Sequence, residues 1–331
     1  IKVNKVQGKG IDIKGKEYEQ KDLAYSDEGI SINADKIKLS GTGTQANKQI
    51  NLNGAVENSA TIYTKEGLKT KGLTNTGTVQ AINKIEVEGN LTNKGEILTN
   101  GNLTAKDTTS TKKLIAKEGV SVDKLENSGI VATDKKLDIK GNLINSGEIQ
   151  TLDNIIVKDN ILNTGDILTN GSLTSKDVKN DKVISVSKDI NIGKLENSGN
   201  VSTAKNLNIN GNLANSGNIQ AVENISATNN VLNKGTILTN GSFTSKDIKN
   251  EKELSVNKDI TVSKLENAGN VVTNSKININ NTLNNIGEVK AMDNITVSGD
   301  TTNNGSILTN KNFVTSNLIN KQKVIAKEKI D

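Results

Sequence analysis

The sequence predicts an all-β protein, a β-solenoid in which each turn of the coil takes about 17–18 residues. Three observations lead to this fold class: the 331 residues contain no proline, the chain carries a long repeat without gaps, and a shorter unit recurs within each long repeat. Proline removes a hydrogen bond from a β-ladder and is confined to edges and bulges. A chain without proline can therefore pair in strands nearly throughout.

The long repeat spans about 70 residues and is visible in two short motifs. LENSG begins at Leu125 and Leu195, and the related LENAG begins at Leu265 with the same spacing. ILTN recurs in step with it at Ile97, Ile167, Ile237 and Ile307. Within one long repeat, asparagines follow one another at nearly equal intervals, namely Asn127, Asn145, Asn163, Asn180 and Asn197.

The short unit has fixed positions for each residue type. Counted from an aliphatic residue or threonine at offset 0, offsets 6 and 12 are apolar in all 16 units and offset 14 is Val or Ile in nine. Offset 2 is Asn in 15 of the 16, with Ser110 as the exception, and offset 4 is Gly in 11. The units start at Val56, Leu73, Leu91, Thr108, Leu125, Leu143, Ile161, Val178, Leu195, Leu213, Val231, Ile248, Leu265, Leu283, Thr301 and Leu318.

Short strands separated by bends account for this unit. Offsets 12 and 14 alternate with polar neighbours, as in Leu137-Asp138-Ile139, and a period of two places both apolar side chains on one face of a strand. An amphipathic helix would need apolar residues at helical spacing, and leucine-rich repeats would carry a tighter cluster of leucines. In a solenoid, equivalent residues stack about 4.8 Å apart, so we expect offsets 0, 6, 12 and 14 to form inward columns.

The glycine column predicts a bend in every turn. Glycine suits either a positive φ or a close approach of backbone, and the sequence leaves both explanations open. Once per long repeat the glycine is replaced, by Lys112, Lys182, Lys252 and Gln322. The bend is therefore expected to differ in every fourth turn.

The asparagine column predicts a ladder of side-chain amides along the stack. Fifteen asparagines at one offset can bond to one another, and buried amides without partners would be costly. A row of ligand-binding amides and unpaired turn amides are the alternatives. The ladder requires Asn145, Asn163 and Asn180 to lie in register and within contact.

The chain before Val56 fits the unit loosely. The apolar pairs there lie about 18–20 residues apart, which predicts longer turns; they are Ile11/Ile13, Ile30/Ile32, Ile50/Leu52 and Leu68/Thr70. We therefore divide the chain into irregular turns or a cap over residues 1–55 and a regular β-helix over residues 56–331, in which four turns make one long repeat, or superrepeat. About 19 turns would make a rod roughly 90 Å long.

Composition narrows the chemistry. The chain has no His, Cys, Trp or Arg, so imidazole bases, thiol nucleophiles and ordinary zinc sites are excluded, and we expect no enzyme, cofactor, metal or catalytic residue. The net charge of +5 comes from lysine alone and is spread evenly, which argues against nucleic-acid binding.

No apolar run approaches the roughly 18 residues of a membrane helix, and we expect no membrane insertion. Because the chain starts with Ile1 and no signal peptide, we interpret it as an internal piece of a longer precursor.

The unit L-x-N-x-G-x-I followed by I-x-V resembles the filamentous haemagglutinin repeats of large two-partner-secreted exoproteins. It is seen in residues 143–149 with Ile155 and Val157, and the resemblance covers Val56–Asp331. The resemblance implies a right-handed parallel β-helix, a hand that agrees with the general preference of parallel crossovers. It also implies the extracellular shaft of a Gram-negative adhesin or of a contact-dependent inhibition toxin.

Several expectations about function follow from that resemblance. The chain would be a rigid, non-catalytic shaft, secreted or held at the bacterial cell surface outside the outer membrane, and an outer-membrane transporter would be its partner during secretion. Its targets would be unidentified glycans or proteins on host or neighbouring cells. The alternative is a toxin stalk that presents a receptor-binding region and a C-terminal effector. Open solenoid ends also make end-to-end self-association an expectation.

A β-helical polysaccharide-active enzyme is the third alternative, because such enzymes need clustered carboxylates or cations on one face. The recurring carboxylates are Asp107, Asp177 and Asp247, beside Lys106, Lys176 and Lys246. Exposed pairs of this kind are common and weak, and a repeated residue is a poor candidate for a single active site. We therefore interpret these residues as solvated side chains on outer strands.

Overall fold

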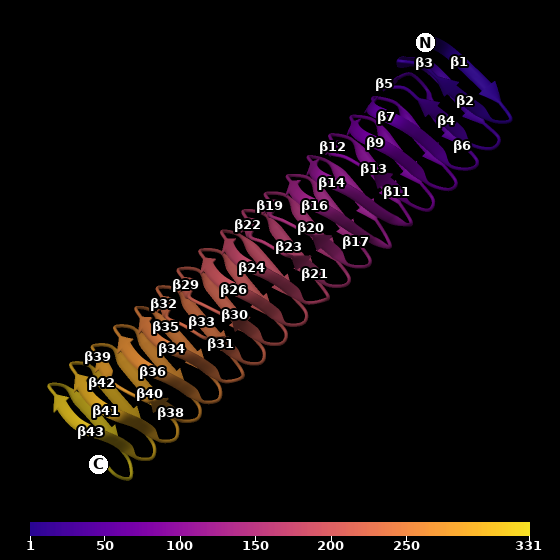
Figure 1. Cartoon of the computed structure of the whole chain (residues 1–331). Coiled ribbons are helices and arrows are strands. Elements are labelled where there is room, and N and C mark those ends of the chain that lie inside the picture. Colours follow the sequence, from indigo (N-terminus) through magenta and orange to yellow (C-terminus); the bar gives the residue numbers. More distant parts are fainter. The chain divides into compact units, whose positions relative to one another are not determined.

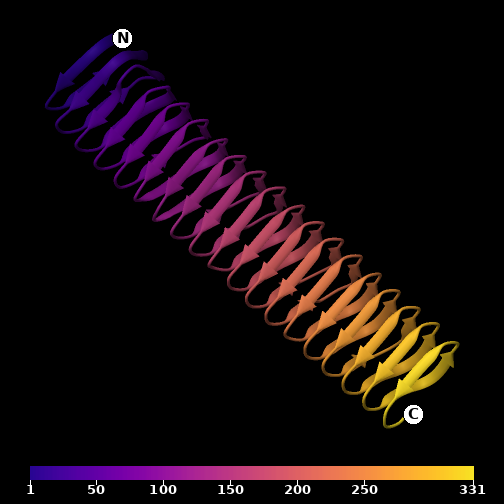
Figure 2. The same ribbon diagram turned by 180° about the vertical axis from the view of Figure 1, so that it is seen from behind.

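The computed structural model describes residues Ile1–Asp331, which form parallel strands, turns and bends without any helix. Contacts divide the chain into two units, Ile1–Asn170 and Gly171–Asp331. Each unit is a stack of coils in which every strand pairs with strands of adjacent turns, as Figures 1 and 2 show from opposite sides. The chain is therefore a β-solenoid, a parallel β-helix, as the repeats predict, with about 18 turns where the sequence suggested about 19.

The strands of the first unit are β1 (Lys2–Gly8), β2 (Ile11–Lys14), β3 (Glu17–Ser26), β4 (Ile30–Asn33), β5 (Lys36–Leu39), β6 (Gly43–Ala46), β7 (Ile50–Asn58), β8 (Thr61–Thr64), β9 (Leu68–Asn75), β10 (Thr78–Ala81), β11 (Ile85–Val87), β12 (Leu91–Asn93), β13 (Glu96–Thr99), β14 (Asn102–Ser110), β15 (Lys113–Ala116), β16 (Gly119–Asn127), β17 (Ile130–Thr133), β18 (Leu137–Ile139), β19 (Leu143–Asn145), β20 (Glu148–Thr151), β21 (Ile155–Val157), β22 (Ile161–Asn163) and β23 (Asp166–Thr169).

Those of the second unit are β24 (Leu173–Asn180), β25 (Val183–Val186), β26 (Ile190–Asn197), β27 (Asn200–Thr203), β28 (Leu207–Ile209), β29 (Leu213–Asn215), β30 (Asn218–Ala221), β31 (Ile225–Ala227), β32 (Val231–Asn233), β33 (Thr236–Thr239), β34 (Phe243–Asn250), β35 (Glu253–Val256), β36 (Ile260–Asn267), β37 (Asn270–Thr273), β38 (Ile277–Ile279), β39 (Leu283–Asn285), β40 (Glu288–Ala291), β41 (Ile295–Asn303), β42 (Ser306–Thr309), β43 (Phe313–Asn320) and β44 (Lys323–Ala326).

Each turn has three faces, which we name by the offsets of the repeat. Face A carries offsets 0–2, face B offsets 5–8 and face C offsets 12–14. One turn thus runs through β19 on face A, β20 on face B and β21 on face C before β22 returns to face A. The register confirms the predicted period, because Leu143 pairs with Ile161 and Ile149 pairs with Ile167, each the equivalent residue of the next unit. In the second unit, Val178 pairs in the same way with Leu195.

The corner between faces C and A decides the length of a turn. In the shorter turns one strand continues round this corner, as β24 and β26 do. In most longer turns a three-residue segment separates the two strands, as residues 158–160 separate β21 from β22. The exception after Val56 is β41, which continues round the corner of a longer turn with a shift in its register. The superrepeat contains two turns of each kind, so its period is not a multiple of either turn length.

The chain before Val56 continues the same coil. Ile11 pairs with Ile30, Ile30 with Ile50, and Ile50 with Leu68, which are the apolar pairs identified from the sequence. The boundary at residue 55 itself stays a prediction. The units found by contacts meet instead between Asn170 and Gly171.

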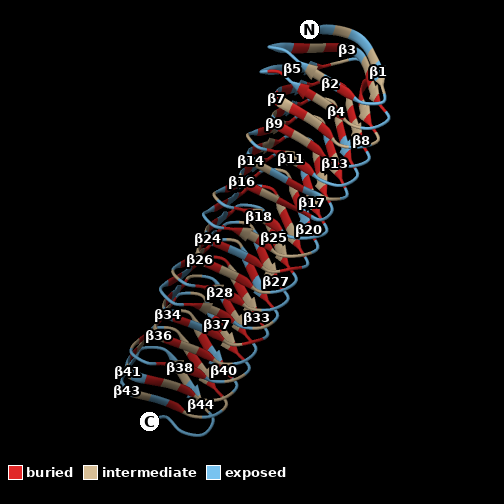
Figure 3. Cartoon of the chain, turned by 45° about the vertical axis from the view of Figure 1, so that its right-hand side comes forward, coloured by how far each residue is buried: buried red, intermediate tan, exposed pale blue.

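The core consists of the predicted apolar columns. Leu143, Ile149 and Ile155 are fully buried, and the same offsets are buried in nearly every turn (Figure 3). The last turn is the exception, because Leu318 is 37% exposed. Burying an aliphatic side chain contributes on the order of 1.5–3 kcal/mol before entropy, so the stack gains stability with each turn.

The glycine column serves close approach rather than positive φ. Positive φ occurs only at Gly41, Gly43 and Gly119, which lie outside offset 4. A Cβ at Gly147 would lie 2.1 Å from the carbonyl oxygen of Gly129 in the turn below. The backbones of successive turns therefore leave no space for a side chain at this bend.

A different bend in the turns where lysine replaces this glycine stays a prediction. The Gly147 N–H donates to the Asn127 carbonyl over 3.2 Å, and the corresponding N–H of Lys112 makes no such bond. The N–H of Gly95 lacks it as well, so this bond does not separate lysine bends from glycine bends.

Candidate functional surfaces

The asparagine column forms the predicted ladder at the corner between faces A and B. Asn145 Nδ2 donates to Asn163 Oδ1 over 2.9 Å and also to the carbonyls of Gly147 and Asp166 over 3.2 and 3.1 Å. Both asparagines are fully buried. Asn180 begins the ladder of the second unit and donates to Asn197 Oδ1 over 2.8 Å. The ladder is structural, because its amides are buried and bond to one another and to backbone carbonyls.

Serine weakens the ladder at one position of the first unit. Asn93 Nδ2 donates to Ser110 Oγ over 3.3 Å, and Ser110 Oγ donates to the Lys112 carbonyl over 3.4 Å. The serine side chain does not reach Asn127 in the next turn. The second unit has no such gap, since its asparagines bond in succession from Asn180 to Asn320.

A second polar column was missed by the sequence argument. Offset 8 is buried in nearly every turn and is Thr, Ala or Val, for example Thr99 and Ala116. Thr64 Oγ1 donates to the Lys48 carbonyl over 2.5 Å and accepts the N–H of Glu66 over 3.1 Å. These threonines close the corner between faces B and C. The absence of large residues at offset 8 was the signal that could have revealed it.

The recurring aspartates lie on the corner between faces C and A. Asp107 faces Lys124 of the next turn, at 4.0 Å, rather than its neighbour Lys106. Asp177 and Asp247 have the same register opposite Lys194 and Lys264. Four turns separate Asp177 from Asp247, which is about 19 Å along the stack. Glycosidases place their two carboxylates roughly 5–9.5 Å apart, so these aspartates do not form such a pair.

The strongest charge cluster of the first unit is an ion-pair network on face C. Lys69 Nζ lies 3.0 Å from Glu86 and 2.8 Å from Glu88, and Lys84 lies 3.1 Å from Glu86. Hydrogen bonds from Lys69 and Lys84 lower the pKa of Glu86, and those to Glu88 and Glu86 raise the pKa of Lys69. Glu86 is thus held ionised and both carboxylates are paired, which suits a structural role better than acid–base catalysis.

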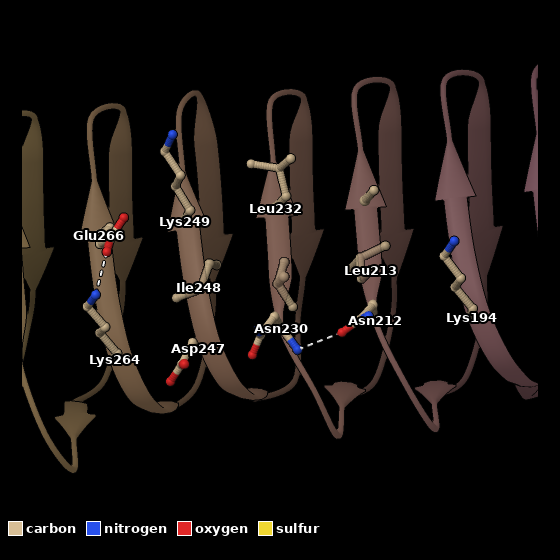
Figure 4. A pocket seen from close by; sticks show the side chains of 12 residues that line it. Lys194, Asn212, Leu213, Asn230, Leu232, Asp247, Ile248, Lys249, Lys264 and Glu266 are labelled. Carbon is tan, nitrogen blue, oxygen red and sulfur yellow. Dashed lines mark hydrogen bonds and ion pairs between the residues drawn. The ribbon is translucent and has the colours of Figure 1, made fainter.

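The second unit has an open hollow of about 430 Å³ on face A and the adjoining corner (Figure 4). Its lining includes the small Ala214 and the larger Leu232 of the next turn, which occupy the same outward offset. A polar row runs along one side, where the Asn230 N–H donates to Asn212 Oδ1 over 3.1 Å. Lys264 on this rim is paired with Glu266 at 2.5 Å. The hollow can hold part of a ligand against the face but contains no reactive pair of side chains.

No metal or membrane element accompanies these surfaces. Nowhere do three carboxylates gather closely enough to hold a metal ion. No helix of the structure is long and apolar enough to cross a membrane.

Comparisons with models of protein families, with curated proteins and with solved structures find no match for this chain. The resemblance to filamentous haemagglutinin repeats therefore remains a hypothesis that depends on the repeat unit. What the structure adds is the geometry of the three faces.

Proposed function

We propose that this chain is a non-catalytic shaft segment of a bacterial adhesin that acts outside the outer membrane. The observation that carries the proposal is the uniform interior. The same buried columns and the same asparagine ladder recur from turn to turn, so each turn mainly supports its neighbours. A chain in which each turn mainly stacks on its neighbours is suited to hold binding surfaces at a distance from the cell.

Secretion through an outer-membrane transporter is compatible with this construction. Strands pair with the turn before and the turn after, as β20 does with β17 and β23. A chain that emerges unfolded can add one turn at a time to those already formed, because folding of such arrays propagates between neighbours. We propose the transporter as the partner during export.

Attachment to host or neighbouring cells would use the outward side chains of the three faces. These positions vary from turn to turn, for example Ile144, Ala214 and Asn284 at equivalent places of successive superrepeats, while the inward positions stay constant. Outward side chains can therefore vary to form local binding surfaces, while the constant inward side chains keep the turns stacked. The partners would be surface glycans or proteins.

The proposal is tested by the adhesion to cells of beads that carry the chain in a single orientation. The chain has no cysteine, so one cysteine added at its N-terminus couples every molecule in the same direction. Beads carrying the chain are expected to adhere to cultured epithelial cells or to bacteria more than beads carrying an unrelated lysine-rich protein of equal net charge. The same beads carrying heat-unfolded chain should lose that adhesion, because the surfaces exist only on the stack.

Other results would replace the proposal. Beads that bind no cell type would contradict adhesion by this segment. A stalk function would then be supported if toxin delivery by the full-length precursor requires this segment but tolerates its outward residues being changed. Release of fragments from acidic polysaccharides, abolished by a single carboxylate substitution, would instead establish an enzyme.

A further inference from the structure

Face C of the second unit carries an uncharged file of outward side chains. Its members occupy offset 13, and each lies opposite the next in the register of the paired strands. We name this set the neutral file: Thr174, Asn191, Asn208, Ser226, Thr244, Thr261, Asn278 and Thr296. The file ends at Thr296, because the residue that pairs with it in the next turn is the apolar and exposed Val314. The same file of the first unit includes the charged residues Asp12, Lys69, Glu86 and Asp138. The two units therefore differ in chemistry on an equivalent surface.

Part of the neutral file is oriented by its own hydrogen bonds. Asn208 Nδ2 donates to Asn191 Oδ1 over 2.8 Å, and Ser226 Oγ donates to Asn208 Oδ1 over 3.1 Å. These bonds fix the direction in which each amide offers its remaining donor and acceptor. A ligand would meet groups that are already in place, which lowers the entropy lost on binding.

The rest of the file has unused hydrogen-bonding capacity. The side chains of Thr244, Thr261, Asn278 and Thr296 make no hydrogen bond within the chain, and all except exposed Thr244 are half-buried. Their hydroxyls and amides must bond to water or to a ligand. Along the stack these groups repeat about every 4.8 Å, so a polymer can make the same contact turn after turn.

Residues on both sides of the neutral file also carry amide and hydroxyl groups. Asn224 Nδ2 donates to Asn206 Oδ1 over 3.1 Å on one side of the file, and Asn210 and Thr228 lie on the other. The charged residues that border the file are Asp189, Asp259, Lys176, Lys246 and Lys276, two acidic and three basic. The border of the file therefore carries only one excess positive charge.

This chemistry selects among classes of ligand. The file has no aromatic or large aliphatic side chain, the groups that dominate protein–protein binding energy. It has no concentration of lysine, which nucleic acids and acidic polysaccharides would require. Amides and hydroxyls in regular order match the hydroxyl groups of a sugar polymer. We propose that the neutral file binds an uncharged polysaccharide that lies along the stack; this rests on the proposed adhesive function and specifies its ligand.

The test measures binding of the whole chain to immobilised dextran, mannan and galactan, with heparin and chitosan as charged comparisons. We expect retention on at least one uncharged polysaccharide, unchanged between about 50 and about 200 mM salt, because no counterions are released. Thr244→Glu with Thr261→Glu should lower the apparent affinity at least about tenfold, since a bound sugar would bury unpaired carboxylates. Thr244→Val with Thr261→Val should also weaken binding by removing two hydroxyls without changing shape.

The repeat supplies a matched control. Thr104 and Ser121 occupy the same offset on face C of the first unit, two superrepeats before Thr244 and Thr261. Thr104→Glu with Ser121→Glu should leave binding unchanged, and thermal melts of both double variants establish that the fold is intact. Equal losses in the two double variants, or retention on heparin alone, would overturn the inference. No retention on any uncharged polysaccharide would overturn it as well, while continued bead adhesion to cells would leave the proposed function standing.

Discussion

Asn127 and Asn145 lie in successive turns, and Asn127 Nδ2 donates to Asn145 Oδ1 over 2.9 Å. The same amide also bonds to the carbonyls of Gly129 and Glu148 over 3.1 and 3.0 Å. One side chain thus joins its own bend to the turn above. Buried amides in a row satisfy one another, and asparagine suits this position because its side chain supplies a donor to one neighbour and an acceptor to the other.

The ladder makes Asn145→Asp costly. Aspartate has no amide donor, so the Gly147 and Asp166 carbonyls and Asn163 Oδ1 lose their partner while a charge is buried. We expect a loss of about 2–4 kcal/mol in the free energy of unfolding, measured by denaturant titration at neutral pH. The loss should be smallest below about pH 4, where the free aspartate is also protonated. Asn142→Asp is the control, because exposed Asn142 only accepts the Asn160 N–H, and its effect should stay within about 0.5 kcal/mol.

Ser110→Asn should stabilise the first unit. The longer side chain can accept from Asn93 and donate to Asn127, completing the ladder where it is now weakest. A gain of about 1 kcal/mol is expected from the added hydrogen bond, with an opposite change for Ser110→Ala. Denaturant midpoints of the two variants and the wild type give the answer. A loss for Ser110→Asn would mean that the lysine-containing bend has no space for the amide.

Gly147→Ala tests the close approach of successive bends. Its Cβ would overlap the Gly129 carbonyl oxygen at 2.1 Å, whereas a Cβ at Gly72 meets nothing nearer than 3.8 Å. The first substitution should destabilise the chain by about 1–3 kcal/mol, and Gly72→Ala should change its stability by less than about 1 kcal/mol. Thermal melts of both variants measure the difference. Similar melting temperatures would contradict the packing described for this column.

Tyr18 predicts a stability change at alkaline pH. Its side chain is buried in the first unit, and burial raises the pKa of its phenol to about 12. In the unfolded chain the phenol ionises near pH 10, so between about pH 10 and 12 only the unfolded state gains from losing the proton. Stability is therefore fully present below about pH 10 and declines as the pH rises towards 12. Tyr18→Phe should remove this part of the decline. An ultraviolet titration of the folded variant should also lack the tyrosine ionisation step that the wild type shows at the highest pH.

The period, the inward columns and the asparagine ladder could be predicted from the sequence. Leu143, Ile161 and their equivalents are aliphatic at a constant interval because each has the same neighbours above and below. A stack repeats its environment, and the repeat therefore records the fold directly.

Other features depend on contacts that a repeat does not encode. The sequence left two roles open for the glycines, and only the distance from Gly147 to the Gly129 carbonyl selects between them. Thr64 and its equivalents went unnoticed because a small residue in a strand carries no strong pattern. The sequence placed Asp107 beside Lys106, whereas its partner is Lys124, because residues in register on successive turns lie only about 4.8 Å apart.

The amino-acid sequence alone determined that this chain is a coil of stacked turns with an apolar interior and an amide ladder. It could do so because every turn must satisfy the same packing and hydrogen-bonding requirements at the same offset. The tertiary structure decided how the corners accommodate turns of two lengths, which charges meet across turns, and that the uncharged side chains of the neutral file face outward in one line on face C. Those properties arise between residues of different turns, so they exist only once the register of the stack is fixed.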